Sequence, residues 1–140
     1  LATWSARLDQ VRRQDARPTL IVAHSFGCLA TAHSLARDPQ GVAGVLLVGP
    51  ADPDKFGVAK ALPQKRLPCP GILIASQTDP WMTAEHAAQW ARRWNCKYID
   101  GGALGHINAE SRLGDWVYGQ AQLQTLFDLA QSDKRHRQAA

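Results

Sequence analysis

The sequence lacks the features of several protein classes. Its three cysteines are an odd number with no C-x-x-C pair, which argues against a disulfide framework and favours free thiols in a reducing compartment, the cytoplasm. No apolar run approaches the roughly 18 residues that a membrane span needs, so we expect no membrane partner. There is no P-loop and no G-x-G-x-x-G segment, and the five histidines show no paired ligand spacing and no acids clustered with them. We therefore expect neither a nucleotide cofactor nor a metal.

A basic stripe interleaved with aromatic residues is also missing, although the formal net charge is +4. Two groups of positive residues stand out, one after the first predicted helix pattern and one in the C-terminal tail: Arg12, Arg13, Arg17, Lys134, Arg135 and Arg137. This distribution does not suit nucleic acid, which we do not expect as a partner. The length of 140 residues and the 45% hydrophobic content suit a single domain, which we place at residues 1–130. We expect residues 131–140 to form a basic, flexible tail.

What the sequence does contain is a regular alternation of strand and helix patterns. Runs of consecutive apolar residues, rather than alternating ones, predict strands that are covered on both faces. The predicted strands span residues 19–23, 42–48, 71–76 and 97–99, and the predicted helices span residues 2–14, 27–36, 84–95 and 116–130. The long connection at residues 51–70 is either a small lid or a surface loop. This pattern predicts an α/β fold, a three-layer αβα sandwich with a mainly parallel sheet.

The chain opens directly on a helix pattern. Leu1, Trp4, Leu8 and Val11 recur at helical spacing and predict the buried face of an amphipathic first helix. An α/β domain rarely begins with a helix that has no preceding strand to pack on. We therefore expect the first strand or strands of the sheet to lie ahead of residue 1, in a protein about 40–50 residues longer.

Polar side chains follow four of the predicted strands. In a parallel sheet, catalytic groups gather beyond the carboxyl ends of the strands. Ser25, Asp52, Asp79 and His106 occupy such positions, and they give the chain order nucleophile, acid, histidine that is typical of α/β-hydrolases. We favour Asp79 over Asp52 as the acid, because the hydrolase acid most often follows the second strand after the nucleophile strand.

The segment Ala23-His24-Ser25-Phe26-Gly27 is a nucleophile elbow, G-x-S-x-G, with alanine in place of the first glycine. The elbow needs small residues beside the serine, because the strand and the helix come close at this strained turn. We expect Gly27 to hold the more demanding position, where the helix passes nearest the strand.

Each candidate residue has a chemical role. Ser25 needs a base to become a nucleophile, and His106 suits that role because an unperturbed imidazole has a pKa of about 6.5. Asp79 would orient and stabilise the imidazole. The main-chain N–H of Phe26, at the start of a helix, would contribute one oxyanion-hole donor.

Two further residues are candidates for contact with substrate. His24 lies beside the serine, where it either contacts substrate or is a packing or hydrogen-bonding neighbour, a role that we favour over that of a second base. Trp81 directly follows the Asp79-Pro80 turn, where it is either a wall of the substrate pocket or a residue packed on a helix.

Three segments, "LIVAHSFGCLA", "GILIASQTDPWM" and "GGALGHINAESRLGDW", resemble the small serine hydrolases typified by retinoblastoma-binding protein 9 and its bacterial relatives. The most specific of the matching stretches is "GHINAESRLGDW" (residues 105–116). The resemblance implies a compact, nearly lidless α/β-hydrolase domain with Ser25, Asp79 and His106 as its triad. Members of this family usually carry a first strand, a Pro-Gly-Trp-type loop and a second strand ahead of the matching region. The loop after the first strand is similar to the one that gives the second oxyanion-hole donor.

The resulting hypothesis is a serine hydrolase that cleaves small-acyl carboxylic esters through an acyl-enzyme intermediate. Small acyl groups are favoured because little cap exists to bind a long one. The alternative is a protein-interaction module on a hydrolase fold with a vestigial triad. A lyase or thioesterase-like reaction with the same three residues stays open. The expected partner is a small-molecule ester, and the sequence carries no signal of the oligomeric state.

Overall fold

The computed structural model describes residues 1–140 and contains a four-stranded, fully parallel sheet in the order β1-β2-β3-β4. The strands are β1 (Thr19–Ser25), β2 (Val42–Pro50), β3 (Gly71–Ala75) and β4 (Lys97–Asp100). The helices are α1 (Ala2–Arg12), α2 (Phe26–Arg37), α3 (Ala84–Trp94) and α4 (Val117–Ala139), with short 3-10 turns at Ala59–Ala61 and Ala109–Ser111. The predicted α/β sandwich is confirmed.

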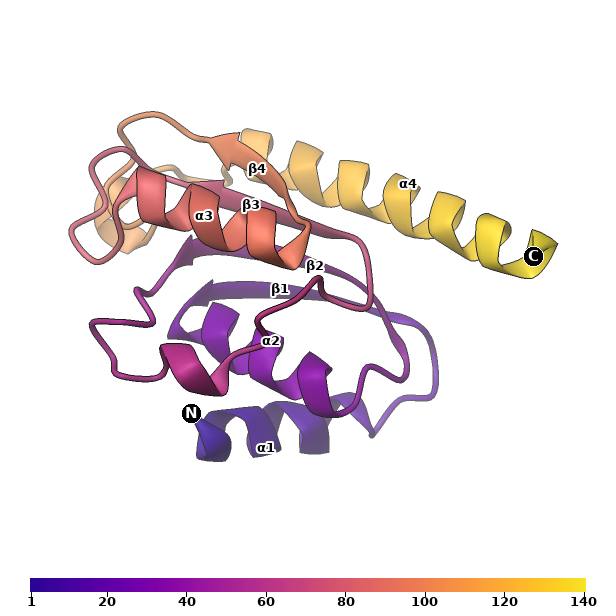
Figure 1. The fold of residues 1–140 in the computed structure, drawn as a ribbon. Coiled ribbons are helices and arrows are strands. Elements are labelled where there is room, and N and C mark those ends of the chain that lie inside the picture. The colour runs from indigo at the N-terminus through magenta and orange to yellow at the C-terminus, as the bar shows by residue number, and fades with distance from the viewer.

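Two layers of helices cover the sheet (Figure 1). Helices α2 and α3 lie on one face, where the larger part of the core includes the fully buried Leu29, Leu47 and Trp94. Helix α4 lies on the other face over β2 and β3, where Leu126 packs against Ile72 and Ile74. Strands β2 and β3 are therefore buried on both sides, as their consecutive apolar residues predict.

Strand β1 departs from this prediction. It is one of the two edge strands, and α4 reaches only its beginning, where Leu20 packs against the cluster that contains Leu126. The later residues on that face are accessible. Val22 is 57% exposed, and His24 is exposed two residues further along. The other face of β1, which carries Ile21 and Ala23, is buried under α2. The run of residues 19–23 is thus covered on one face only.

The buried face of α1 confirms the prediction from apolar spacing only in part: Leu1 and Leu8 pack against the core, but the fully buried residues are polar. Trp4 is 57% exposed and Val11 is 47% exposed, whereas Ser5 and Asp9 are buried against α2. Ion pairs and hydrogen bonds account for this difference. Asp9 accepts hydrogen bonds from Ser34, Arg12 and Arg37, at 2.5, 3.2 and 3.1 Å.

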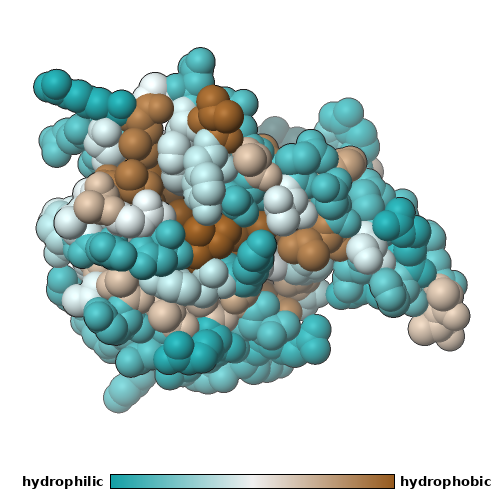
Figure 2. Space-filling view, turned by 90° about the horizontal axis from the view of Figure 1, so that it is seen from above, coloured by the Kyte–Doolittle hydropathy of each residue, from teal (hydrophilic) through white to brown (hydrophobic).

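Helix α4 is longer than predicted. It continues to Ala139, so residues 131–139, expected as a flexible tail, are helical. The end of α4 projects from the body of the molecule, and Figure 2 shows it covered mainly by hydrophilic residues. No helix of the structure is long and apolar enough to cross a membrane.

The connection from β2 to β3 is anchored rather than free. Leu62 and Leu67 are buried in the core, and the carboxylate of Asp52 accepts a hydrogen bond of 2.9 Å from the main-chain N–H of Asp54. Between these anchors, Phe56 is 46% exposed beside the carboxyl ends of the strands. The segment is a surface loop that reaches the rim of the candidate site.

Candidate active site

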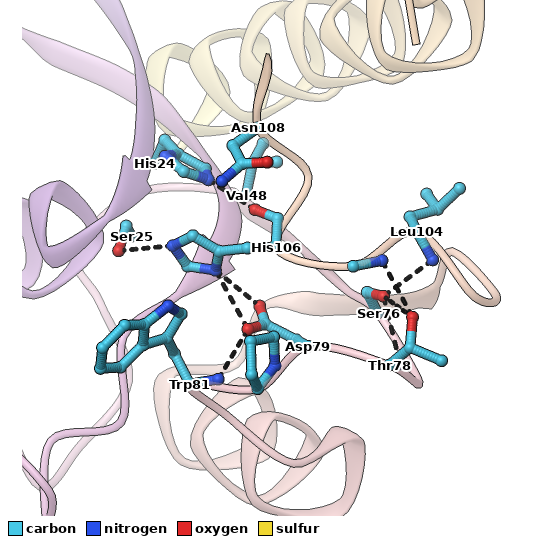
Figure 3. A network of polar contacts seen from close by, with 12 residues as sticks. His24, Ser25, Val48, Ser76, Thr78, Asp79, Trp81, Leu104, His106 and Asn108 are labelled. Carbon is cyan, nitrogen blue, oxygen red and sulfur yellow. Dashed lines mark hydrogen bonds and ion pairs between the residues drawn. The ribbon is translucent and has the colours of Figure 1, made fainter. Parts of the chain in front are cut away.

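Three polar side chains from separate strand ends meet at the carboxyl edge of the sheet (Figure 3). Ser25 ends β1, Asp79 follows β3, and His106 follows β4. The Nε2 atom of His106 lies 2.9 Å from Ser25 Oγ, and its Nδ1 atom lies 3.0 Å from each carboxylate oxygen of Asp79. The carboxylate fixes the hydrogen on Nδ1, which leaves Nε2 to accept the serine hydrogen.

The backbone at Ser25 adopts a conformation that non-glycine residues rarely take, with φ 54° and ψ −125°. Ser25 is the N-cap residue of α2, a position where a serine hydroxyl usually accepts a bond from the first helical turn. Its side chain makes no such bond and meets His106 instead. The strained turn between β1 and α2 therefore presents the hydroxyl to the imidazole.

Asp79 is held in place from two sides. Its side chain is only 2% exposed, and Oδ1 also accepts a hydrogen bond of 2.9 Å from the main-chain N–H of Trp81. The competing candidate, Asp52, lies elsewhere and pairs with His86, whose Nδ1 is 3.1 Å from Asp52 Oδ2. Of the two acids, only Asp79 contacts His106.

The loop that carries His106 is fastened to the loop that carries Asp79. The hydroxyls of Ser76 and Thr78 each accept a hydrogen bond of 2.9 Å, from the main-chain N–H groups of Leu104 and Gly105 respectively (Figure 3). These bonds cross between the segments that follow β3 and β4. The acid and the base are consequently mounted on one rigid unit.

The segment 105–116, the most specific part of the sequence pattern, forms a tight scaffold around His106. Its positive φ angles are at Gly105 (59°), Ile107 (50°), Arg112 (52°), Gly114 (58°) and Trp116 (43°). A positive φ is a strained conformation for a β-branched residue such as Ile107, and the side chain of Ile107 is buried in the core under α4. Core burial of this neighbour thus fixes the backbone at His106.

His24 and Gly49, which the sequence did not mark as members of the triad, both lie against the main chain of His106. His24 Nε2 lies 2.8 Å from the main-chain oxygen of His106, and a carbonyl oxygen only accepts, so His24 donates. Gly49 (φ 49°) ends β2 between the triad strands, where an added Cβ would lie 3.1 Å from the His106 carbonyl oxygen and 3.6 Å from Asp79 Oδ2. In the sequence, only the Gly49-Pro50 pair at the end of the strand indicates that the main chain passes close to another segment here.

The residues that follow Ser25 differ in part from the predictions. Phe26 begins α2, so its main-chain N–H lies at the positive end of the helix beside the serine. Gly27 is not tightly confined, because an added Cβ would meet only Ala23 Cβ, at an ordinary 3.9 Å. The predicted demand for glycine at this position is wrong. Cys28 is fully buried, and burial raises the pKa of its thiol, so it is no rival nucleophile.

A second cluster, Asp52, Asp54 and His86, joins acids and a histidine that are far apart in the sequence, contrary to the expectation that they would not cluster. Nδ1 of His86 lies 3.1 Å from Asp52, and Nε2 lies 3.2 Å from Asp54. The two ring nitrogens point in different directions. Trp90 Nε1 donates a hydrogen bond of 3.2 Å to Nε2, so Nδ1 carries the hydrogen that Asp52 accepts, and the group is a hydrogen-bonded cluster. Burial raises the pKa of Asp52, but the contact with His86 and the hydrogen bonds from the main-chain N–H groups of Asp54 and Lys55 together outweigh this and hold the pKa below its ordinary value.

Trp81 stands at the open side of the triad. Its ring is 51% exposed and lies 6.4 Å from the imidazole of His106, next to the Ser25–His106 pair in Figure 3. Its aromatic neighbours are Phe56 and His106, which both lie in loops. A cavity of about 430 Å³ borders Trp81, His106 and Asn108. A larger cavity, about 670 Å³, lies at the opposite end of the strands against α4 and touches none of the triad.

Comparison with known proteins agrees with this geometry. The sequence profile of the family described as "Serine hydrolase" matches residues 1–125. No curated protein sequence matches the chain. The chain is 34% identical to a structure described as a YdeN-like hydrolase from Pectobacterium atrosepticum, with a TM-score of 0.84, and the match covers 93% of this chain and 69% of that one.

Two more distant structures share the fold. A hydrolase of the alpha/beta superfamily from Xanthomonas campestris is 20% identical, with a TM-score of 0.58, over 91% of this chain and 66% of that one. The esterase domain of a Rhodothermus marinus protein is 16% identical, with a TM-score of 0.67, over 87% of this chain and 68% of that domain. The chain thus spans about two thirds of the length of these structures.

Proposed function

Because the chain belongs to the serine hydrolase family, we propose that it hydrolyses carboxylic esters with Ser25 as nucleophile, His106 as base and Asp79 as the acid. The observation that carries this proposal is the hydrogen-bonded series from Asp79 through His106 to Ser25, with all three donor–acceptor distances at 2.9–3.0 Å. The narrower resemblance to the group of retinoblastoma-binding protein 9 is part of the proposal.

The reaction proceeds in two halves. Ser25 Oγ attacks the ester carbonyl carbon while His106 Nε2 takes the hydroxyl proton, and the N–H of Phe26 stabilises the negative oxygen that forms. His106 then gives the proton to the leaving alcohol, and the acyl group stays on Ser25. Water repeats the sequence with His106 as base, which releases the acid and restores the serine. Asp79 stabilises the imidazolium in both halves.

We expect short acyl groups to be preferred. The triad faces open rim residues such as Trp81, and the loop of residues 51–70 does not cover the serine with a cap of its own. Esters are preferred over amides, because an alcohol leaves more readily than an amine and needs less positioning by the enzyme.

A fluorophosphonate probe tests the proposal directly, since it labels only serines that a neighbouring base has activated. We expect labelling of the wild-type protein and of a Ser34→Ala variant, and none of Ser25→Ala. Hydrolysis of ethyl acetate should fall by about 10⁴-fold in Ser25→Ala and in His106→Ala. A wild-type protein that is folded yet neither labelled nor active on esters would refute the assignment and favour a binding module with a vestigial triad.

A further inference from the structure

Four aromatic side chains form a continuous row that starts at the triad. From the His106 imidazole, successive ring centroids lie 6.4 Å away at Trp81, then 6.5 Å at Phe56, 5.3 Å at Phe26 and 5.2 Å at Trp4. All these spacings lie within the range of attractive aromatic contacts. The row connects α1, the start of α2 and the loops that follow β2 and β3.

This row is open to solvent. Trp4 is 57% exposed, Phe56 is 46% exposed and Trp81 is 51% exposed. Single exposed apolar side chains are common on soluble proteins, but contiguous ones that border a polar site mark a surface that binds an apolar group. The rings come from four separate segments. The packing of any single helix or loop therefore does not explain why they lie in a row.

The chemistry of the triad fixes which part of an ester meets the row. His106 Nε2 must reach the leaving oxygen in order to protonate it, so the alcohol part of the ester lies beside the imidazole. Trp81 is the ring next to that nitrogen and to Ser25 (Figure 3), and Phe56 continues the surface beyond it. The acyl group, attached to Ser25 in the intermediate, is directed elsewhere.

We propose that Trp81 and Phe56 bind the alcohol part of the substrate, and that the substrates are short-acyl esters of aromatic alcohols. This inference rests on the proposed function. The ring centroids of Trp81 and Phe56 lie 6.5 Å apart and the ring planes are inclined by 38°, so that one flat, two-ring system is large enough to contact both side chains. Each aromatic contact of this kind favours binding by about threefold to tenfold beyond the effect of buried area.

The test compares 2-naphthylmethyl acetate with ethyl acetate. Both release an alkanol, so the chemical reactivity of the two esters is closely matched. We expect the wild-type kcat/KM to favour the naphthylmethyl ester by at least about tenfold. In Trp81→Ala and in Phe56→Ala this preference should fall by about threefold or more, mainly through a higher KM. Phe127→Ala, which removes an equally exposed ring (47%) on α4 far from the triad, should keep the preference.

A second measurement uses the wild-type protein alone. Free 2-naphthylmethanol should inhibit hydrolysis of ethyl acetate competitively, at concentrations at least tenfold below those at which propanol does. This result does not depend on the folding of any variant.

Three results would overturn the inference: a wild-type preference near one, a preference unchanged in both ring variants, or a stronger preference for an aromatic acyl group in ethyl 2-naphthylacetate. In each case, fluorophosphonate labelling of Ser25 and hydrolysis of ethyl acetate would show that the proposed function itself stands. Loss of both would show that the proposed function has failed.

Discussion

The imidazole of His24 donates a hydrogen bond of 2.8 Å from Nε2 to the main-chain oxygen of His106, and the two rings lie 4.7 Å apart. His24 precedes the nucleophile on β1, and His106 lies on the loop after β4. One side chain therefore couples an edge strand of the sheet to the loop that carries His106. This contact explains why His24 faces the site without touching Ser25 Oγ.

For this reason His24→Ala should lower kcat by about fivefold to tenfold with little change in KM, the effect of one lost hydrogen bond that holds the base. His24→Gln, whose amide can donate, should recover part of the loss. Steady-state kinetics on ethyl acetate, together with melting curves, provide the measurement. A His24→Ala variant as active as the wild type would show that the contact does not position His106.

The two glycines near the triad should differ sharply in their tolerance of a methyl group. In Gly49→Ala the new Cβ would press on the His106 carbonyl oxygen at 3.1 Å while the residue keeps a positive φ, so kcat should fall by at least about tenfold. Gly27→Ala meets only an ordinary contact and should keep near wild-type activity. Equal kcat values for the two folded variants would contradict the geometry.

The two candidate acids provide another matched comparison. Asp79→Asn should reduce kcat by about 10⁴-fold, because the amide no longer favours the tautomer that accepts the serine proton. Asp52→Asn weakens the contact with His86 and leaves the triad intact, so labelling by fluorophosphonate should persist. Loss of labelling in the Asp52 variant but not in the Asp79 variant would reverse the assignment of the acid.

The buried carboxylate of α1 should make the stability depend on pH. Burial raises the pKa of Asp9, but hydrogen bonds from Ser34 and Arg12 and the charges of Arg12 and Arg37 outweigh it and hold the pKa below its ordinary value. The ionised group therefore stabilises the fold above the ordinary aspartate pKa of about 3.9, and this contribution is lost as pH falls through the lowered value.

Asp9→Asn should thus lower the free energy of unfolding by about 2 kcal/mol at pH 7, and the difference from wild type should shrink towards pH 3. Urea unfolding at pH 7 and at pH 3 measures this difference in the free energy of unfolding. The exposed Asp15–Arg17 pair offers a comparison, since Asp15→Asn should leave the urea midpoint unchanged at pH 7. A pH-independent difference for Asp9→Asn would contradict the role of its charge.

The sequence predicts most of the fold because consecutive apolar residues are an unambiguous sign of strands covered on both faces. The prediction works for β2 and β3, which α4 and the opposite helices enclose. It fails for one face of β1, because the residues of this strand do not show that α4 covers only its beginning. The separate prediction from helical spacing holds only in part for α1: Leu1 and Leu8 pack against the core, but partners on α2 bury Asp9, and Trp4 stays at the surface.

The site is predictable to the extent that topology determines it. Ser25, Asp79 and His106 could be selected because parallel strands place their carboxyl ends at one edge. The contacts of His24 and Gly49 could not, since they depend on distances of 3.1 Å or less between main-chain and side-chain atoms from different strands. The contact between Asp52 and His86 could not be predicted either, because it joins side chains from segments that are far apart in the sequence.

The unpaired edge of β1 also affects the tendency of the 140-residue polypeptide to self-associate. On one side, the amide and carbonyl groups of β1 have no partner strand, and Val22 is more than half exposed. Such an edge can pair with the same edge of another molecule in concentrated samples. The Val22→Lys substitution places a charge on this strand. It should raise the protein concentration at which light scattering detects aggregates, without affecting kcat.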